Sequence, residues 1–91
     1  MMPFEVGERV ICTAPSDGNY DIVGMVGTVC GPINDFWCGV EFEDTFPRGH
    51  DCHGRCPKGY GWDCEYGVLE PYNEPETAET VVIMPYEELN I

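Results

Sequence analysis

Soft metal ligands are concentrated in one short stretch of this chain. His50, Cys52, His53, Cys56 and Cys64 all lie between positions 50 and 64. Structural zinc takes four Cys or His ligands in a tetrahedron, and closely spaced ligands on a loop can supply them. The Cys52–Cys56 pair has the spacing C-x3-C, which lies within the range of zinc sites, although the sequence contains no paired C-x2-C knuckles.

Two interpretations of this stretch stay open. In the first, no cofactor is bound, His50 and Cys56 pack to hold the loop against Trp62, and Cys12, Cys30 and Cys38 are small core residues. In the second, the chain is a zinc-stabilised structural module with His50, Cys52, Cys56 and Cys64 as the metal ligands. A chelator would unfold the protein only in the second case.

The same stretch contains a candidate nucleophile. Cys52 lies between Asp51 and His53, but side chains adjacent in sequence rarely converge as a thiol, its base and its orienting group must. The glycines at 24 and 27 lack the lysine and the following helix of a phosphate-binding loop. We therefore expect a protein that is not an enzyme.

Aromatic and arginine side chains favour recognition of a partner instead. Trp, Tyr and Arg are the residues that most often dominate affinity at protein interfaces. The predicted partner-binding residues are Trp37, Arg48, His50, Arg55, Tyr60 and Trp62. The main functional expectation is a non-enzymatic module that binds a protein or a peptide.

The charge of the chain is strongly negative. Seventeen acidic residues stand against Arg9, Arg48, Arg55 and Lys58, giving a formal net charge of -13. A field of this sign repels phosphate backbones, so direct nucleic-acid binding is not expected. It also supports an alternative function, an acidic decoy that inhibits a nucleic-acid-binding host enzyme by occupying its basic groove.

Targeting signals are not recognisable in the sequence. No apolar run has the length of a membrane span, and the N-terminal residues lack the pattern of a signal peptide. The expectation is a cytoplasmic protein without a membrane partner. In that compartment the six cysteines are expected to be free thiols or metal ligands rather than disulfides.

The elements that must position these residues are short strands. Frequent Gly and Pro, with many Val, Tyr, Phe and Trp, favour an all-β fold. Strands are predicted at 10–14, 24–30, 36–43, 61–66 and 68–72, with a long Gly/His/Cys loop over 44–59. Alternation in the third strand directs Phe36, Cys38, Val40 and Phe42 to the core and Trp37 to the outer face. Five short strands are most simply closed into a small barrel, which leaves no exposed edge.

The composition changes after Pro71. Residues 1–72 are predicted to form the barrel, and residues 73–91 an acidic linker followed by a strand at 80–84 and a short helical turn. If this extension strand pairs with its own barrel, the protein is a monomer. Pairing with a second copy would make a homodimer.

Several segments resemble known barrel modules. Residues 7–10, 24–29 and 37–43 together resemble the opening of SH3-like barrels of the KOW and CAP-Gly kind, and the resemblance covers about residues 4–72. CAP-Gly domains bind acidic tails through a Gly-Lys-Asn-Asp-Gly loop, whereas this chain reads Arg-Gly-His-Asp-Cys-His-Gly at 48–54. The resemblance therefore implies the barrel and not that binding activity.

A second resemblance is more specific in its residues. The chain is similar to small uncharacterised proteins of bacteria and their phages that share a Gly-His-Asp, Cys, Gly-Trp and Leu-Glu pattern. The matching residues are Gly49, His50, Asp51, Gly54, Cys56, Gly59, Gly61, Trp62, Leu69 and Glu70. Asp63 departs from the pattern, in which an aromatic residue often follows the tryptophan. This group implies no activity.

Overall fold

A computed structural model describes residues 3–73 of the chain. This part is all-β and forms one antiparallel sheet of five strands. The strands are β1 (Arg9–Cys12), β2 (Val26–Pro32), β3 (Trp37–Phe42), β4 (Gly61–Glu65) and β5 (Leu69–Pro71), and a 3-10 turn, η1 (Tyr66–Val68), joins the last two. Each predicted strand of the barrel region is confirmed, with its ends shifted by no more than two residues.

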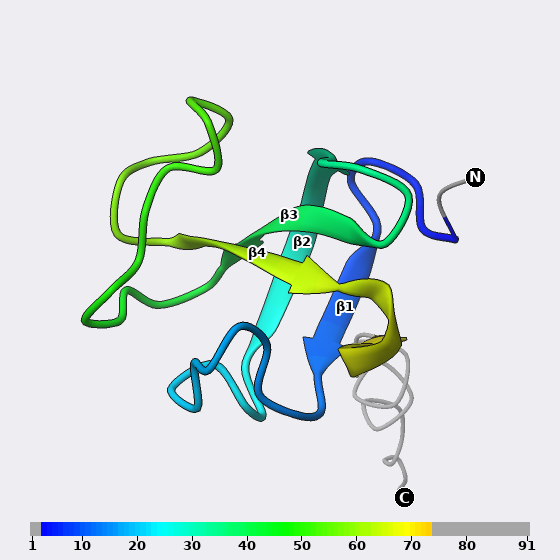
Figure 1. Cartoon of the computed structure of the whole chain (residues 1–91), viewed down its shortest axis with the longest axis horizontal. Helices are drawn as coiled ribbons and strands as arrows, with labels where there is room; N and C mark the ends of the chain where they lie inside the picture. Colours follow the sequence, from blue (N-terminus) through cyan, green and yellow to red (C-terminus); the bar gives the residue numbers. More distant parts are fainter. Residues whose placement is uncertain (1–2, 74–91) are drawn as a thin grey trace, which may run out of the picture.

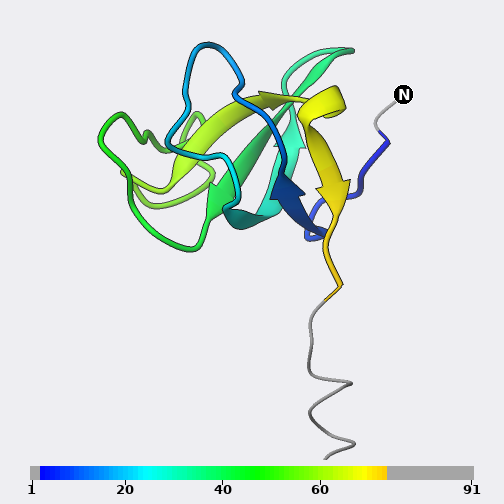
Figure 2. The same ribbon diagram turned by 90° about the horizontal axis from the view of Figure 1, so that it is seen from below.

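The sheet is a meander whose last strand returns to the first. Its order is β4-β3-β2-β1-β5, with β5 paired antiparallel to β1 through Val10–Pro71, Ile11–Glu70 and Cys12–Leu69 (Figure 1). The strands curve around a common interior (Figure 2). Within residues 3–73, however, β4 and β5 are the two edges and do not pair with each other, so the structure shows an open sheet.

Strand alternation builds the core. In β3, Cys38, Val40 and Phe42 are buried, while Trp37 and Glu41 on the other face are only half-buried. Apolar residues of the remaining segments complete the same cluster, namely Phe4, Val10, Cys12, Ile22, Val29, Phe46, Trp62, Cys64 and Leu69. The core is small, as expected for a unit of this size.

Phe36, predicted to lie in the core, is 71% exposed. The side-chain oxygen of Asn34 accepts the backbone N–H groups of Phe36 and Trp37 at 2.8 and 3.1 Å. These bonds form an Asx turn that holds Phe36 outside the ladder, and β3 begins one residue later. The alternation was correct, but it starts at Trp37.

The segment between β1 and β2 covers the free side of β4. Ser16 and Asn19 are buried and bridge each other across Asp17 and Gly18, both of which have positive φ, as a two-residue Asp-Gly hairpin turn requires. The Ser16 hydroxyl oxygen accepts the N–H of Glu65 at 3.0 Å. This edge strand is thereby shielded from pairing with another chain.

Among residues 3–73, no helix is long and apolar enough to cross a membrane. The predicted extension strand at 80–84, its homodimer pairing and the helical turn lie outside the described residues.

Candidate functional site

The connection between β3 and β4, here called the 43–60 loop, is tied back to the start of β4. His50 and Gly61 form a bridge in which each N–H donates to the carbonyl of the other, at 2.9 and 2.8 Å. The N–H groups of Arg55 and Cys56 both donate to the carbonyl of Asp51, at 2.8 and 3.1 Å. The loop therefore has a defined shape and can hold side chains in fixed positions.

Cys52 lies on the outer face of the sheet, over two glycines. A Cβ added to Gly39 would lie 3.2 Å from the Cys52 Sγ, and a Cβ added to Gly61 would lie 2.6 Å from it. The thiol is fully buried and donates weakly to the carbonyls of Val40 and Trp62, at 3.6 and 3.8 Å. Small residues at 39 and 61 are what give this thiol its place.

Cys30 reaches the same place from β2, at a β-bulge. Val29 pairs with Val40 and Gly31 with Gly39, so Cys30 is an extra residue without a partner in the ladder. Cys30 follows the buried Val29, so strand alternation directs its side chain to the outer face of the sheet. The Cβ of Cys30 consequently lies 3.8 Å from the position that a Gly39 Cβ would take, close to Cys52.

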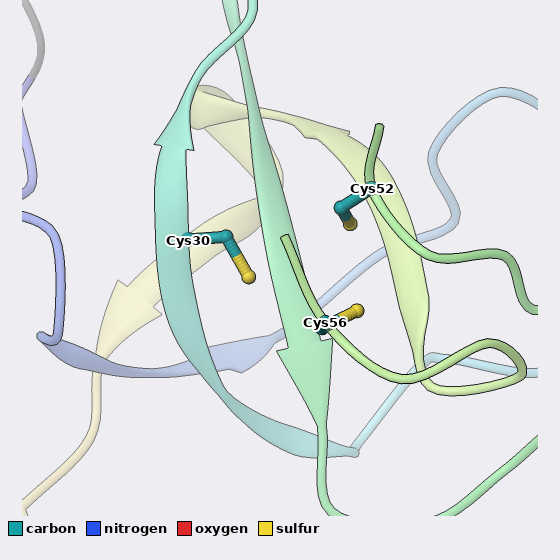
Figure 3. A group of neighbouring side chains, drawn as sticks. All are labelled: Cys30, Cys52 and Cys56. Carbon is teal, nitrogen blue, oxygen red and sulfur yellow. The ribbon is translucent and has the colours of Figure 1, made fainter. Parts of the chain in front are cut away.

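Three thiols meet at this point. The sulfur atoms of Cys30, Cys52 and Cys56 all lie within 4.8 Å of one another, one from β2 and two from the 43–60 loop (Figure 3). We call these residues the thiol cluster. None is in a disulfide, and all six cysteines of the chain are free.

The environment of the thiol cluster keeps its members protonated. Burial raises the pKa of Cys30 to about 11, and the neighbouring Cys56 and Glu41 add to the effect. Burial is also the main cause that raises the pKa of Cys52 and of Cys56. Because the thiolate is the reactive form, such groups are poor nucleophiles without a metal or a cation to stabilise it.

His50 supports the cluster and packs on the core. Its ring Nδ1 accepts the N–H of Cys52 at 2.9 Å, so this nitrogen carries no proton. The ring stacks on Trp62 with 5.3 Å between ring centroids and 28° between planes, which confirms the predicted packing of His50 against Trp62. The guanidinium of Arg48 lies 5.4 Å from the Trp62 ring centroid and donates to the carbonyl of Gly18 at 3.2 Å.

Trp62 itself is part of the core. It is 8% exposed, its Nε1–H donates to the Ser16 carbonyl at 3.0 Å, and Phe46 packs edge-on against it. A partner could reach only a small part of this ring. Trp62 holds the 43–60 loop and the segment before β2 in place.

A carboxylate borders the thiol cluster. His50, Cys52 and Asp63 form a second group of close ligand atoms that shares Cys52 with the cluster. One oxygen of Asp63, Oδ2, lies 3.4 Å from Nε2 of the exposed His53. The other, Oδ1, is buried and has no hydrogen-bond partner. A buried carboxylate oxygen without a partner is costly unless a cation or water satisfies it.

The structure brings together only part of the predicted ligand set. Cys52 and Cys56 are neighbours, but Cys64 lies on the inner face of β4, opposite Cys38 and beside Cys12. Alternation places Cys64 on the core face of β4, opposite to the face on which Cys52 lies over Gly61. Cys30, which the loop-centred sequence pattern did not include, takes part in its place.

The remaining predicted residues lie around the cluster. Arg55 donates to the Pro32 carbonyl at 3.1 Å, and its guanidinium lies over Gly31. Trp37 is half-buried at the start of β3, opposite Glu65. Tyr60 is half-buried where the loop enters β4. Of the six predicted partner-binding residues, Arg48 and Arg55 are exposed, three are half-buried and Trp62 is buried.

An open pocket of about 290 Å³ adjoins the root of the loop. It is lined by Arg9, Thr28, Glu41, Phe42, Glu43 and Tyr60. Arg9 pairs with Glu43 and also donates to the Thr28 hydroxyl at 3.0 Å. We call this feature the Tyr60 pocket.

No family model, no curated protein and no solved structure matches this chain.

Proposed function

We propose that this protein is a non-enzymatic recognition module that binds a basic side chain of a protein or peptide partner. The observation that carries the proposal is the Tyr60 pocket, an open concave site with carboxylates and an aromatic ring in its lining. Sites that bind ligands are typically concave, with a few polar groups that fix orientation.

The chemistry of the lining favours a cation. Glu41 and Glu43 contribute two carboxylates, and Arg9 already pairs with one of them. Tyr60 offers a ring against which a guanidinium or an ammonium can pack. The formal net charge of -13 would draw a basic segment toward the surface and raise its rate of encounter.

The proposed architecture is an SH3-like barrel. Five short antiparallel strands, a last strand beside the first and a long elaborated loop agree with the resemblance noted in the sequence. In this arrangement Arg48, His50 and Trp62 have a supporting role, because they fix the loop whose end carries Tyr60.

A selection from a random peptide library displayed on phage would test the pocket. The expected result is enrichment of peptides that contain Arg or Lys. For an enriched peptide, Glu41→Gln should weaken binding about tenfold, which corresponds to about 1.4 kcal/mol. The matched control is Glu70→Gln, which removes the same charge from an exposed position on β5 and should leave the affinity unchanged.

Two results would contradict the proposal that the Tyr60 pocket binds a basic side chain. Enrichment of acidic peptides would do so directly. An equal loss of affinity in both variants, with a steep dependence on salt, would instead support the decoy hypothesis, in which the whole acidic surface acts. Tyr60→Ala with Tyr20→Ala as its control gives a second comparison, because Tyr20 is 74% exposed and does not line the pocket.

A further inference from the structure

We propose that Cys30, Cys52 and Cys56 bind one Zn²⁺ ion as three thiolate ligands, and that this ion fastens the 43–60 loop to β2. The proposal concerns a different site from the Tyr60 pocket and does not depend on it. It also differs from the ligand set expected from the sequence, since only Cys52 and Cys56 are common to both.

The three sulfur atoms are nearly close enough to share one zinc ion. With Zn–S bonds of about 2.3 Å, two sulfurs of a tetrahedral site lie about 3.8 Å apart. The three sulfur atoms lie within 4.8 Å of one another, so side-chain rotations with little backbone movement would complete the triad.

The local backbone is shaped around the sulfurs. Cys30 points to the cluster from the outer face of β2, beside a bulge, and Gly39 and Gly61 supply the space. Cys52, His53 and Gly54 have φ values of 50, 63 and 86°, an unusual run of left-handed residues that costs about 1 kcal/mol or more at each non-glycine position. This conformation places Cys52 and Cys56 on one side of the loop.

Thiol packing alone does not account for the arrangement. The three thiols donate to carbonyl oxygens at 3.6 to 3.9 Å and hydrogen-bond to one another, and all of these contacts are weak. No other cysteine joins the group, because Cys12, Cys38 and Cys64 face the core. A cation that binds thiolates would replace these weak contacts with strong bonds.

Neighbouring groups provide a second shell and a candidate for the fourth ligand. His50 uses Nδ1 to accept the Cys52 N–H, which orients the ligand cysteine and excludes that nitrogen from the metal. The carboxylate of Asp63, with its unpartnered buried oxygen, lies beside Cys52 and supplies an oxygen donor. The fourth position is open to this carboxylate or to water.

Binding can be written as a balanced exchange. One Zn²⁺ replaces the three protons of the thiols, forms three Zn–S bonds and releases the protons to the buffer. No electron is transferred, and no oxidant or reductant takes part. The metal site would be structural, because its ligands come from two segments of the chain and tie them together.

The test uses the full-length protein, purified in reductant without chelator and then titrated with Co²⁺ after removal of metal. We expect one equivalent of zinc by elemental mass spectrometry, and one equivalent of Co²⁺ with a thiolate-to-cobalt charge-transfer band. Cys30→Ser should weaken Co²⁺ binding by more than about 100-fold, since a ligand matters at least as much as its second shell. Circular dichroism confirms that the variant is folded.

Cys64→Ala is the matched control. It removes a thiol of the inner face and should leave the stoichiometry and the charge-transfer band unchanged. The proposal is overturned if the reduced wild-type protein binds Co²⁺ without thiolate absorption, or if Cys30→Ser binds as tightly as wild type. It is equally overturned if Cys64→Ala, still folded, loses the metal.

Discussion

Adding a single methyl group at each of three glycines tests the packing of the 43–60 loop against the sheet. A Cβ on Gly61 would lie 2.6 Å from the Cys52 Sγ, 2.8 Å from the Cys56 Sγ and 2.8 Å from the His50 carbonyl oxygen. A Cβ on Gly39 would meet Cys52, at 3.2 Å from its sulfur and 3.3 Å from its Cβ, and would touch the Cys30 Cβ only at the ordinary contact distance of 3.8 Å. A Cβ on Gly67 would meet no atom within 4 Å beyond its chain neighbours.

The expected cost follows these distances. Gly61→Ala must displace two sulfurs and a backbone carbonyl that is held in the bridge to Gly61 itself, so it should destabilise by about 1–3 kcal/mol, the usual range for overpacking. Gly39→Ala needs a shift of only a few tenths of an ångström and should cost about 1 kcal/mol or less. Gly67→Ala meets open space and should be neutral or stabilising by about 0.4–1 kcal/mol through the unfolded chain.

Urea denaturation followed by circular dichroism, in reductant and chelator, measures the three free energies without a contribution from bound metal. Equal slopes of the transitions would show that the variants share one native and one unfolded state. The reasoning is refuted if Gly61→Ala unfolds at the same urea concentration as Gly67→Ala. That result would mean that the loop does not rest on the sheet where the structure places it.

Two further predictions concern the core. Trp62→Phe keeps an aromatic ring but removes the N–H that the Ser16 carbonyl accepts, and should destabilise the protein by about 1–3 kcal/mol. Trp62→Ala should destabilise it by about 3–5 kcal/mol. If the phenylalanine variant were as stable as wild type in urea, the indole N–H would have no stabilising role. Burial raises the pKa of Cys38 from 9.0 to about 12. The pKa of Cys38 is thus higher in the folded protein than in the unfolded chain. The free energy of unfolding is therefore unaffected by this group below about pH 9, and above that it falls by up to about 1.4 kcal/mol per pH unit. In thermal melts in reductant, the melting temperature should fall between about pH 8 and about pH 10, and it should fall less steeply in Cys38→Ala. If that variant lost stability with pH as steeply as wild type, other groups would be responsible.

Strand positions were predictable from the sequence because they depend on local pattern. Alternation in β3 is strong enough to identify Cys38, Val40 and Phe42 as core residues, and glycine and proline mark the turns. The long loop was equally recognisable from its composition. These features rest on interactions between residues close in the chain.

The make-up of the site depends on interactions that the local pattern does not contain. Trp62 was expected on a binding surface, yet Ser16, forty-six residues earlier in the chain, accepts its N–H and helps to bury it. Cys64 was grouped with the loop cysteines by proximity in sequence, although strand alternation turns it inward. Cys30 was expected in the core, but alternation after the buried Val29 turns its side chain to the outer face, where it meets loop cysteines that are distant in sequence.

The stacking of Trp62 on His50 has an optical consequence. The chain contains two tryptophans, and Trp37 is half-buried at the far end of the β3–β4 pair while Trp62 lies in the core against an imidazole and beneath an arginine. Emission from Trp62 is therefore expected at shorter wavelength than that of a solvated indole, because the ring is buried in the core. In a Trp37→Phe background, the intrinsic fluorescence of the protein would report selectively on whether the 43–60 loop is docked, without any attached dye.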